Sequence, residues 1–588
     1  MDFQSEQDTI QNQILELLGK FGYPQIQLKW TWIPFSGHWG ISTSFFQVAS
    51  QKIQEEGGKS NTQDLAVEIS RTIADKLLLS SEYERVEAVK GYLNIYFHTS
   101  TYAKRIIDHV LLENSVFGSG PDSGLKVMIE FSQPNTHKAF HVGHLRNMVL
   151  GSAVSNILEF AGHTVIRANY LGDIGLHVIT WLWNYQKYHA GQMPPKENKT
   201  RWMGDLYSEA VKRLEKDPTL DTEIRELFKR WDNKENDIVE LWERTRNWSM
   251  EAFEQVYDLL GIKFDRVYFE SEVEEPGKVI VDELITRGLA KDERPEGAVI
   301  VDLDSILGFK EKYRVLVVLR SDGTSLYPTK DLPLAIMKFN EYNLDKSIYV
   351  IDVRQSLYMQ QIFKLLELMG YSWAGQCVHL AYEIVNLPGN VTIASRDGTV
   401  VLLEDLITEA TNRALEIVEG KNPGLTKTEK EAIAKKVAVG AIKYSLLSKD
   451  NTKIITFNWD SALDVNGQAA PYIQYAAVRA NSILRKVNFQ IPESESIQHD
   501  LTQQEIELIN LISRFPIEVQ NSAREMRPLL LTSLSYEIAK AFSNFYNNCP
   551  VLDSEPLVRN FRLRLVSAAK QVITNSLNLL GIEVPEIM

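Results

Sequence analysis

The sequence predicts a multidomain α/β protein, in which a Rossmann-like domain with a helical insertion lies between an α+β N-terminal domain and an all-α C-terminal domain. The chain of 588 residues is too long for one hydrophobic core, since a domain has about 150 residues. Apolar runs alternate with amphipathic stretches after residue 125, and nearly every stretch after residue 426 has helical periodicity. A hydrophobic content of 44% and a charged content of 24% are typical of a folded, soluble protein.

The composition excludes several classes of protein. No run of 18 or more apolar residues is present, and the N-terminal stretch MDFQSEQDTIQNQ is polar and acidic. We therefore expect neither a membrane span nor a signal peptide, and we place the protein in the cytoplasm. The two cysteines, Cys377 and Cys549, are too few for a disulfide framework or a multi-cysteine zinc site, so we expect buried thiols.

The net charge of −14 argues against a general nucleic-acid binder, because such proteins neutralise phosphates with an excess of Lys and Arg. A local basic face is still compatible with the sequence. Its candidates are Arg479, Arg485, Lys486, Arg559, Arg562, Arg564 and Lys570. The alternative is that these side chains lie on ordinary solvated helix faces.

The N-terminal domain, residues 1–118, combines predicted helices at 8–21 and 62–79 with a predicted strand at 92–97, which favours an α+β fold. The run GSGPDSG at 118–124 continues neither helical nor strand periodicity, because Gly, Ser and Pro interrupt both. It therefore predicts a domain boundary.

The middle domain, residues 119–405, begins with a predicted βαβ unit made of a strand at 127–131, a helix at 145–160 and a strand at 164–168. Between residues 182 and 278 the pattern is purely helical. A parallel sheet does not continue for a hundred residues without a strand, so we expect an insertion there.

Strand patterns return at 298–301, 315–319 and 347–353, and the last two are apolar enough for a sheet that is buried on both faces. The C-terminal domain, residues 406–588, is then expected to be a helical bundle. Its predicted helices are 429–447, 469–485, 503–514, 531–547 and 558–580.

The sequence His141-Val142-Gly143-His144 follows the first strand of the βαβ unit, at the start of the helix. A helix N-terminus presents unpaired N–H groups, Gly143 allows close backbone approach, and imidazole N–H groups stabilise charge that develops on a phosphate. Two histidines near a helix start are more often packing or capping residues. The flanking residues decide between these interpretations.

Those flanks resemble the class I arginyl-tRNA synthetases. The block Glu130-Phe131-Ser132, Pro134-Asn135, Lys138 and Phe140-His141-Val142-Gly143-His144-Leu145-Arg146 is similar to the family's EFSSPNIAKPFHVGHLR segment. Further matches, in the family's order, are Asn169-Tyr170-Leu171-Gly172-Asp173, Tyr327-Pro328-Thr329-Lys330-Asp331, Val353-Arg354-Gln355, Ala462-Leu463-Asp464 and Pro471-Tyr472-Ile473-Gln474-Tyr475-Ala476. The resemblance covers nearly all of the chain and is weakest in the first hundred residues and in the helical insertion.

The resemblance implies ATP-dependent ligation of L-arginine to its cognate tRNA in protein synthesis, through an arginyl-adenylate, with release of AMP and pyrophosphate. It implies a class I synthetase catalytic domain, an N-terminal domain that contacts the tRNA elbow and a C-terminal domain that binds the anticodon. It further implies ATP as substrate, Mg²⁺ as cofactor, tRNA(Arg) as partner and a monomer. No protein metal site is expected, and no enzyme nucleophile is needed, because the carboxylate of arginine attacks the α-phosphorus of ATP.

The resemblance also implies roles for individual residues. The catalytic candidates are Lys138, His141, His144 and Arg396. The ATP-binding candidates are Lys138, His141, Gly143, His144, Ser395 and Arg396. The arginine-binding candidates are Glu130, Ser132, Asn135, His144, Tyr327, Asp331 and Gln355, where Glu130 and Asn135 hold the α-amino and carboxylate ends. The tRNA-binding candidates are Tyr472, Gln474, Arg479 and Tyr546.

The arginine candidates agree with the chemistry of the ligand. A guanidinium group is a permanent planar cation with five donors, so a selective pocket needs carboxylates and acceptors at fixed positions. Tyr327 and Asp331 lie four residues apart, on one face if this segment is helical. Taken alone, Asp331 would be a helix N-terminal or surface carboxylate and Tyr327 a core tyrosine.

The second signature of class I synthetases, KMSKS, corresponds to Thr392-Ile393-Ala394-Ser395-Arg396. Thr392 replaces the first lysine, and Arg396 is the cation that remains. In the family, the lysine before the histidine motif, Lys138 here, is thought to compensate for such a loss. An alternative is that SRDGT forms a plain turn, which Asp-Gly favours.

Two other functions are compatible with parts of the sequence. A small-molecule adenylyltransferase also combines HxGH with a Rossmann-like sheet, although it needs no RNA-reading domain such as the C-terminal helices. An inactive synthetase-like protein that holds tRNA without charging it would explain Thr392 and Ala394, although both histidines and the arginine candidates are present.

Overall fold

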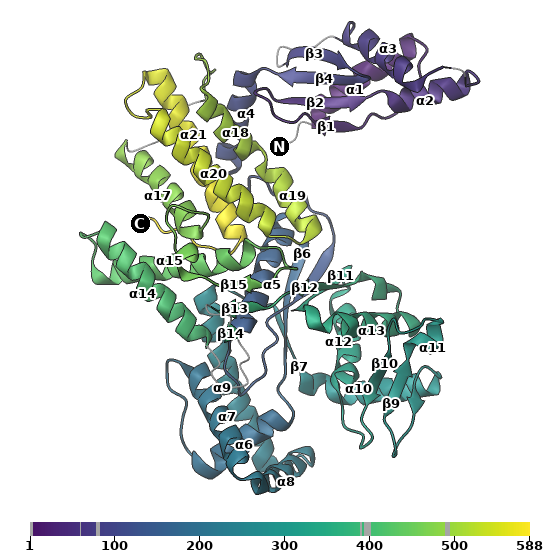
Figure 1. Ribbon diagram of the computed structural model, residues 1–588, viewed down its shortest axis with the longest axis vertical. Helices are drawn as coiled ribbons and strands as arrows, with labels where there is room; N and C mark the ends of the chain where they lie inside the picture. Colours follow the sequence, from purple (N-terminus) through teal and green to yellow (C-terminus); the bar gives the residue numbers. More distant parts are fainter. Residues whose placement is uncertain (1–3, 59, 78–82, 388–390, 393–401, 488–493) are drawn as a thin grey trace. The chain divides into compact units, whose positions relative to one another are not determined.

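The computed structural model describes residues 4–58, 60–77, 83–387, 391–392, 402–487 and 494–588 (Figure 1). The chain forms two compact units. The first comprises Met1–Gly118, Ala476–Glu518 and Leu534–Asn575, and the second comprises Ser119–Tyr475, Val519–Ser533 and Ser576–Met588. No helix in the described segments is long and apolar enough to cross a membrane.

The N-terminal part of the first unit is an antiparallel sheet with helices. The strands lie in the order β1-β2-β4-β3 and are β1 (Trp30–Trp32), β2 (Gly40–Ser44), β3 (Tyr83–Val89) and β4 (Tyr92–Phe97). The helices are α1 (Gln4–Lys20), α2 (Phe46–Glu55), α3 (Thr62–Ala74) and α4 (Thr99–Glu113). Alternate residues of β4 are buried, as expected for a strand with one face on a core, and the predicted strand at 92–97 is confirmed.

The second unit is built on a five-stranded parallel sheet in the order β12-β11-β5-β6-β7. These strands are β5 (Lys126–Glu130), β6 (Thr164–Leu171), β7 (Arg266–Phe269), β11 (Lys346–Asp352) and β12 (Cys377–Tyr382). The chain runs from β5 to β6 and β7 on one side, and β11 and β12 extend the sheet on the other side. The strand order therefore reverses between β5 and β11, and ligands of such sheets bind at the carboxyl ends of the strands at this point.

The predicted βαβ unit is confirmed, with α5 (Val142–Phe160) between β5 and β6. The strand predicted at 347–353 is β11, and its central residues are buried. The strand predicted at 315–319 is β10 (Val315–Leu319), but the prediction that it belongs to a sheet buried on both faces is wrong. It pairs with β9 (Val299–Asp302), which in turn pairs with β8 (Lys291–Asp292), in a separate antiparallel sheet, and alternate residues at its start face solvent.

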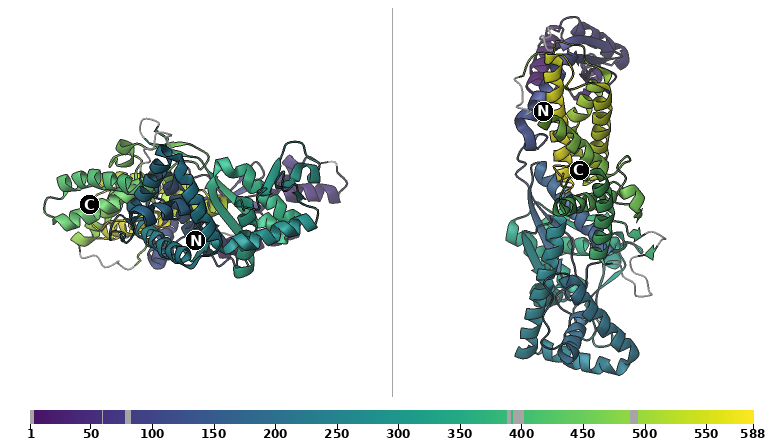
Figure 2. Two further views of the ribbon diagram at one scale, coloured as in Figure 1. Left: turned by 90° about the horizontal axis from the view of Figure 1, so that it is seen from below. Right: turned by 90° about the vertical axis from the view of Figure 1, so that its left-hand side faces the viewer.

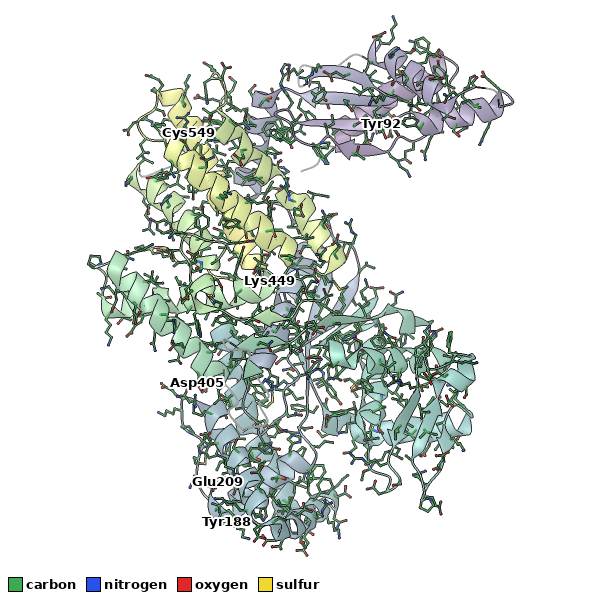
Figure 3. The ribbon with its side chains drawn as sticks, in the orientation of Figure 1. Tyr92, Tyr188, Glu209, Asp405, Lys449 and Cys549 are labelled. Atoms are coloured by element: carbon green, nitrogen blue, oxygen red, sulfur yellow. The ribbon has the colours of Figure 1, made fainter. Side chains whose placement is uncertain are left out.

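The helical insertion contains α6 (Leu176–Tyr188), α7 (Lys199–Lys216), α8 (Asp221–Asp232) and α9 (Asn236–Leu260), which form one bundle (Figure 2). Its core contains several tryptophans, among them Trp181, Trp183, Trp242 and Trp248. Tyr188 and Glu209, which are labelled in Figure 3, both contact Arg213. The Cζ atom of Arg213 lies 3.8 Å from the centroid of the Tyr188 ring, and its Nε donates to Glu209 Oε1 at 3.0 Å.

The prediction of a purely helical stretch from 182 to 278 is wrong for one segment, because Arg266–Phe269 forms the strand β7, which pairs with β6. This strand has only four residues and lies at the edge of the sheet, so it carries too little periodicity to interrupt a helical pattern. The helices of the insertion proper end with α9.

Three helices beside the core sheet are α10 (Glu270–Thr286), α12 (Tyr327–Tyr342) and α13 (Ser356–Leu368), and the short α11 (Leu303–Leu307) follows β9. The predicted C-terminal helices are confirmed as α15 (Lys427–Leu447), α17 (Ala470–Lys486), α18 (Gln503–Ser513), α20 (Leu529–Asn548) and α21 (Pro556–Leu579). The remaining elements are β13 (Val385–Leu387), β14 (Val391–Thr392), α14 (Leu403–Lys421), β15 (Ile455–Thr456), α16 (Trp459–Ala462) and α19 (Phe515–Glu525). Both cysteines are buried, as expected.

Gly277 sets the distance between α10 and α12, and this packing positions the first turn of α12. A Cβ atom at Gly277 would lie 1.9 Å from the backbone oxygen of Thr329. We predict that Gly277→Ala destabilises the second unit by about 2 kcal/mol, because the helices must separate. The measurement is the midpoint of thermal unfolding by calorimetry.

Gly420 is the matched control, since it is also helical and its Cβ would meet nothing within 4 Å. Gly420→Ala should leave stability unchanged or raise it by up to about 1 kcal/mol, through helix propensity alone. An equal loss in both variants would contradict the packing role of Gly277.

Candidate functional site

Two adjoining cavities open at the carboxyl ends of β5 and β11. The histidine cavity, of about 750 Å³, is lined by Ser132, Gln133, His141, Gly143, His144, Arg146, Asn147, Ile351, Asp352, Arg354, Gln355, Tyr382, Ile384, Val385 and Asn386. The carboxylate cavity, of about 350 Å³, is lined by Glu130, Gln133, Asn135, Tyr170, Gly172, Glu270, Tyr327, Asp331, Leu334, Tyr349, Ile351, Gln355, Met359, Ile362 and Phe363. Because Gln133, Ile351 and Gln355 line both, the cavities share a border.

The two histidines are held as neutral hydrogen-bond donors. His141 Nδ1 accepts from the backbone N–H of Gly143 at 3.1 Å, and His144 Nδ1 accepts from the backbone N–H of His141 at 3.2 Å. The proton of each neutral ring therefore lies on Nε2. Burial lowers the pKa of His141, with a smaller contribution from Lys138, and burial and His141 hold the pKa of His144 well below its usual range. The two rings, whose centroids lie 3.8 Å apart at an interplanar angle of 32°, thus offer N–H groups without adding charge.

The loop after β5 adopts a backbone conformation that residues other than Gly rarely adopt. Ser132 and Gln133 have φ angles of 79° and 51°. The side chain of Asn147 accepts from the N–H of Ser132, and the side chain of Asn169 accepts from the N–H of Gln133 at 3.0 Å. These two asparagines stabilise a conformation that otherwise costs about 1 to 3 kcal/mol per residue and that aims the loop at both cavities.

Arg146 connects the helix that carries the histidines to two other segments. Its guanidinium group donates to the backbone oxygens of Glu383 and Ile384, after β12, and to those of Asp450, Asn451 and Lys453. Burial lowers its pKa to about 10. The side chain is therefore a cross-link in the wall of the histidine cavity.

The carboxylate cavity contains three acidic side chains and two lysines that pair with two of them. Lys338, which has no exposed surface, pairs with Glu130, and Lys330 Nζ lies 2.6 Å from Glu270 Oε2. Among the described residues, no Lys or Arg pairs with Asp331, which accepts from the hydroxyl of Tyr358. Burial raises the pKa of Asp331 to about 7, with smaller contributions from Glu130 and Glu270. Asp331 is the position where the cavity can bind one further cation.

The arginine candidates other than Glu130 form three groups, which are Tyr327 with Asp331, Asn135 with Gln355, and Ser132 with His144. Tyr327 and Asp331 both line the carboxylate cavity from α12, which confirms that they share a helix face, and Tyr327 is 71% exposed. Asn135 and Gln355 line the same cavity and are exposed. A Cβ at Gly172 would lie 2.2 Å from Asn135 Oδ1, so Gly172 is what allows the asparagine to approach.

Ser132 and His144 line the histidine cavity rather than the carboxylate cavity. The Ser132 hydroxyl lies 2.9 Å from that of Tyr257. Lys138 lies beside the histidine motif but lines neither cavity, and its Nζ is 4.8 Å from the ring centroid of Tyr207 on α7. Burial lowers the pKa of Lys138.

Ser395 and Arg396 lie outside the described residues, as does Ala394, and the side chain of Thr392 is not described either. Their predicted roles therefore stay predictions. The sequence reasoning did not identify Glu270, Lys338, Tyr358 or the cross-link made by Arg146. Apart from Arg146, which belongs to the quoted motif, these residues lie in segments without a recognisable pattern.

Among the tRNA candidates, Gln474 is corrected by the structure. Its side chain has no exposed surface, and its amide donates to the backbone oxygen of Glu583 at 2.7 Å, so it is a core residue. Arg479 lies over the ring of Tyr546, which is 40% exposed, at 5.0 Å, and Tyr472 is partly exposed. These three remain candidates.

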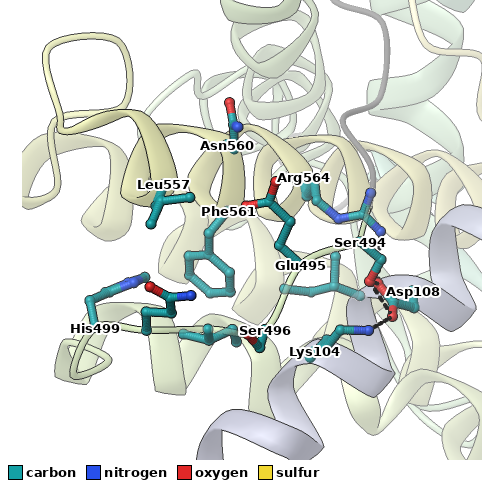
Figure 4. A pocket seen from close by; sticks show the side chains of 13 residues that line it. Lys104, Asp108, Ser494, Glu495, Ser496, His499, Leu557, Asn560, Phe561 and Arg564 are labelled. Atoms are coloured by element: carbon teal, nitrogen blue, oxygen red, sulfur yellow. Dashed lines mark hydrogen bonds and ion pairs between the residues drawn. The ribbon is translucent and has the colours of Figure 1, made fainter.

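The predicted basic face at the C-terminus is reduced by internal ion pairs. Arg562 donates to Glu505 at 2.7 Å, and Arg564 donates to Asp108 at 2.7 Å. Asp108 also accepts from Lys104 and Ser494 beside a small cavity of about 30 Å³, which has room for about one water molecule (Figure 4). This cavity is too small for a substrate.

The described residues contain no group of three or more His, Cys, Asp and Glu side chains that could hold a metal ion.

The parallel sheet, the histidine pair at the start of α5 and the cavity at the switch point are those of a class I tRNA synthetase. Residues 106–459 match the family described as tRNA synthetases class I (R), catalytic domain, and residues 473–588 match the DALR anticodon binding domain. The arginine–tRNA ligase of Halothermothrix orenii is 34% identical over 88% of this chain and 90% of its own, and that of Alkaliphilus metalliredigens is 35% identical over the same shares. The chain belongs to the arginyl-tRNA synthetases.

Solved structures agree with this assignment. The arginyl-tRNA synthetase of Thermus thermophilus superposes with a TM-score of 0.78 at 26% identity, covering 99% of this chain and 100% of that one. The arginyl-tRNA synthetase of Plasmodium falciparum has the same fold, with a TM-score of 0.73 at 21% identity and 99% coverage of both chains.

We predict that Arg146→Lys weakens the wall of the histidine cavity. A lysine has one compact ammonium group and cannot reach both backbone segments, so two or more hydrogen bonds are lost, at about 1 kcal/mol each. The KM for ATP should rise and the thermal midpoint should fall, measured by pyrophosphate exchange and calorimetry.

Arg225→Lys is the control, since Arg225 is 66% exposed and, within the described segments, forms its ion pair with Asp221 on its own helix. It should change stability by less than about 0.5 kcal/mol and leave the KM for ATP unaltered. A wild-type KM in Arg146→Lys would show that the cross-link does not shape the cavity.

Proposed function

We propose that the protein joins L-arginine to its tRNA with ATP as the energy source, and that the histidine cavity receives ATP while the carboxylate cavity receives arginine. The overall reaction follows from membership of the arginyl-tRNA synthetases, and the arginyl-adenylate intermediate is general for that family. The observation that carries the division of roles is the unpaired Asp331, because a cavity with one unneutralised carboxylate is suited to one cation.

In the nucleotide site, the Nε2–H groups of His141 and His144 would donate to phosphate oxygens, and Gly143 would allow the phosphates to approach the start of α5. Lys138 would add the positive charge that the neutral histidines lack. Ser395 and Arg396 complete the proposed ATP site on family resemblance. Mg²⁺ would be held by the phosphates of ATP and would neutralise part of their charge.

In the arginine site, Asp331 would bind the guanidinium group and Tyr327 would add a phenol hydroxyl from the same helix face. Asn135 and Glu130 would hold the backbone end of the amino acid, together with Gln355 at the border between the cavities. Because Lys338 already pairs with Glu130, an α-amino group there must share this carboxylate. Ser132 would act indirectly, by holding the loop after β5.

The tRNA would be bound by residues 1–118 at its elbow and by residues 406–588 at its anticodon, with residues 119–405 as the catalytic domain. Tyr472, Arg479 and Tyr546 are the proposed contacts, since exposed aromatic rings and Arg planes stack on splayed bases. We place the enzyme in the cytoplasm as a monomer. Size-exclusion chromatography with light scattering tests the oligomeric state.

The deciding experiment is ATP–pyrophosphate exchange with each standard amino acid, with and without tRNA. Of the standard amino acids, arginine and no other should support exchange, and it should then be transferred to tRNA(Arg). Tight tRNA binding without any exchange would identify an inactive relative. Exchange that continues when the tRNA-binding domain is absent would favour a small-molecule adenylyltransferase. Absence of arginine-dependent exchange in the presence of cognate tRNA would sink the proposal.

We predict that His144→Ala lowers kcat by about 100-fold and changes the KM for arginine by less than about threefold, because a donor to the transition state is lost. Exchange kinetics give both parameters. His163→Ala, which removes a partly exposed histidine bonded to Ser123, should behave as wild type. A proportional loss of arginine binding in His144→Ala would remove its proposed transition-state role.

We predict that arginine binding weakens as the pH falls. Asp331 has a pKa of about 7 and must be ionised to bind a guanidinium group, which stays protonated throughout. The carboxylate is ionised above this pKa and takes up a proton below it, so the KM for arginine should rise about tenfold between pH 8 and pH 6.

The KM for ATP serves as the internal control of that series and should change little over the same range. Asp331→Asn should raise the KM for arginine and abolish its pH dependence. A steep pH dependence that survives in Asp331→Asn would assign the titration to another group, such as Glu270, whose pKa is raised by burial.

A further inference from the structure

Tyr170 lines the carboxylate cavity and carries a buried phenol hydroxyl. The residue is the penultimate one of β6, so its ring lies at the carboxyl end of the sheet, and it lines the cavity beside Gly172. Its hydroxyl oxygen is buried and has no hydrogen-bond partner in the part of the chain that the structure describes. Buried polar groups in folded proteins nearly always have partners, so this exception needs a reason.

The acidic groups that act on this hydroxyl are Asp331, Glu270 and Glu130, which line the same cavity, and the buried Asp173, which does not line it. Burial raises the pKa of Tyr170 well above its usual range, and the charges of Asp331, Glu270, Glu130 and Asp173 raise it further, in that order. Asp331 contributes most among these charges, and it is the carboxylate without an ionic partner among the described residues. Tyr170 and Asp331 thus both belong to the wall of this one cavity.

A guanidinium group needs more acceptors than one carboxylate provides. It has five N–H donors, and a carboxylate in bidentate contact accepts two of them. A phenol oxygen can accept one of the others with a lone pair. A compact ammonium group on a lysine side chain cannot present this planar fork.

We propose that Tyr170 is a specificity-determining residue, whose hydroxyl accepts a hydrogen bond from the guanidinium group of bound arginine. The proposal rests on the assignment of the carboxylate cavity to arginine in the proposed function. It accounts for a hydroxyl that is buried without a partner at the wall of this cavity. Tyr327 reaches the cavity from α12, whereas Tyr170 reaches it from the sheet.

The test is Tyr170→Phe, which removes only the hydroxyl. The KM for arginine in pyrophosphate exchange with tRNA present should rise about tenfold, because a hydrogen bond to a charged ligand is lost. The kcat should stay within about twofold of wild type, and the KM for ATP should not change. The rise in melting temperature that saturating arginine produces should be smaller in the variant, whereas the melting temperature of the free protein should be equal or higher.

Tyr268→Phe is the matched control. Tyr268 is the register partner of Tyr170 on the neighbouring strand β7, and its hydroxyl donates to Glu341 at 3.0 Å, outside the cavity. Its removal should lower the melting temperature of the free protein, since a bond within the fold is lost, and should leave the KM for arginine unchanged. The comparison of the two variants thus separates a contact with the ligand from an ordinary packing role.

Each outcome decides one question. If the wild-type protein shows no arginine-dependent exchange, the proposed function fails and the inference that rests on it is overturned as well. If the wild type is active and Tyr170→Phe keeps its KM for arginine, the inference is overturned. Equal rises in KM in Tyr170→Phe and Tyr268→Phe would also overturn it. A Tyr170→Phe protein that melts earlier or fails to fold would show that the hydroxyl bonds within the free protein, which contradicts the proposal.

Discussion

The charge balance of the carboxylate cavity is the constraint on which the candidate site depends. Burial of an ionised carboxylate is costly unless a cation or several donors accompany it. Lys338 and Lys330 satisfy this requirement for Glu130 and Glu270, whereas the described residues offer Asp331 the hydroxyl of Tyr358 and no ion pair. The raised pKa of Asp331 is the consequence, because a proton offsets the charge that no lysine neutralises. In the proposed function, arginine replaces that proton, so recognition depends on a carboxylate that the fold leaves incompletely stabilised.

The parallel sheet determines where this cavity meets the nucleotide site. The reversal of strand order between β5 and β11 opens a crevice above both strand ends, and Gln133, Ile351 and Gln355 line the border of the two cavities. Gln133 can occupy that border because its backbone has a positive φ angle, stabilised through the side chain of Asn169. The proposed attack of the arginine carboxylate on the α-phosphorus would take place at this border, and the strain in the loop after β5 would then serve positioning.

The sequence predicted those features that depend on local patterns. The strands at the centre of the parallel sheet are continuous apolar runs, and the spacing of Tyr327 and Asp331 placed both on one face of α12. Partners distant in the sequence were not predictable, because no local pattern pairs Lys338 with Glu130, which lies 208 residues earlier. Two errors have a similar origin. The short edge strand β7 is defined by its pairing with β6 and not by its own residues, and Gln474 is polar but is stabilised in the core by a backbone carbonyl.

Lys138 shows how the helical insertion contributes to the proposed chemistry. Among the described residues it forms no ion pair, and its ammonium group lies over the ring of Tyr207, which belongs to α7 of the insertion. An aromatic ring stabilises a cation without neutralising it. The charge therefore stays available to an anionic ligand. Burial lowers the pKa of His141 and His144, and the charge of Lys138 adds a smaller contribution, so both histidines stay neutral. Charge and hydrogen-bond donation are thus divided between the lysine and the histidine pair. This division favours phosphate binding at the start of α5 even where Thr392 stands in place of a signature lysine.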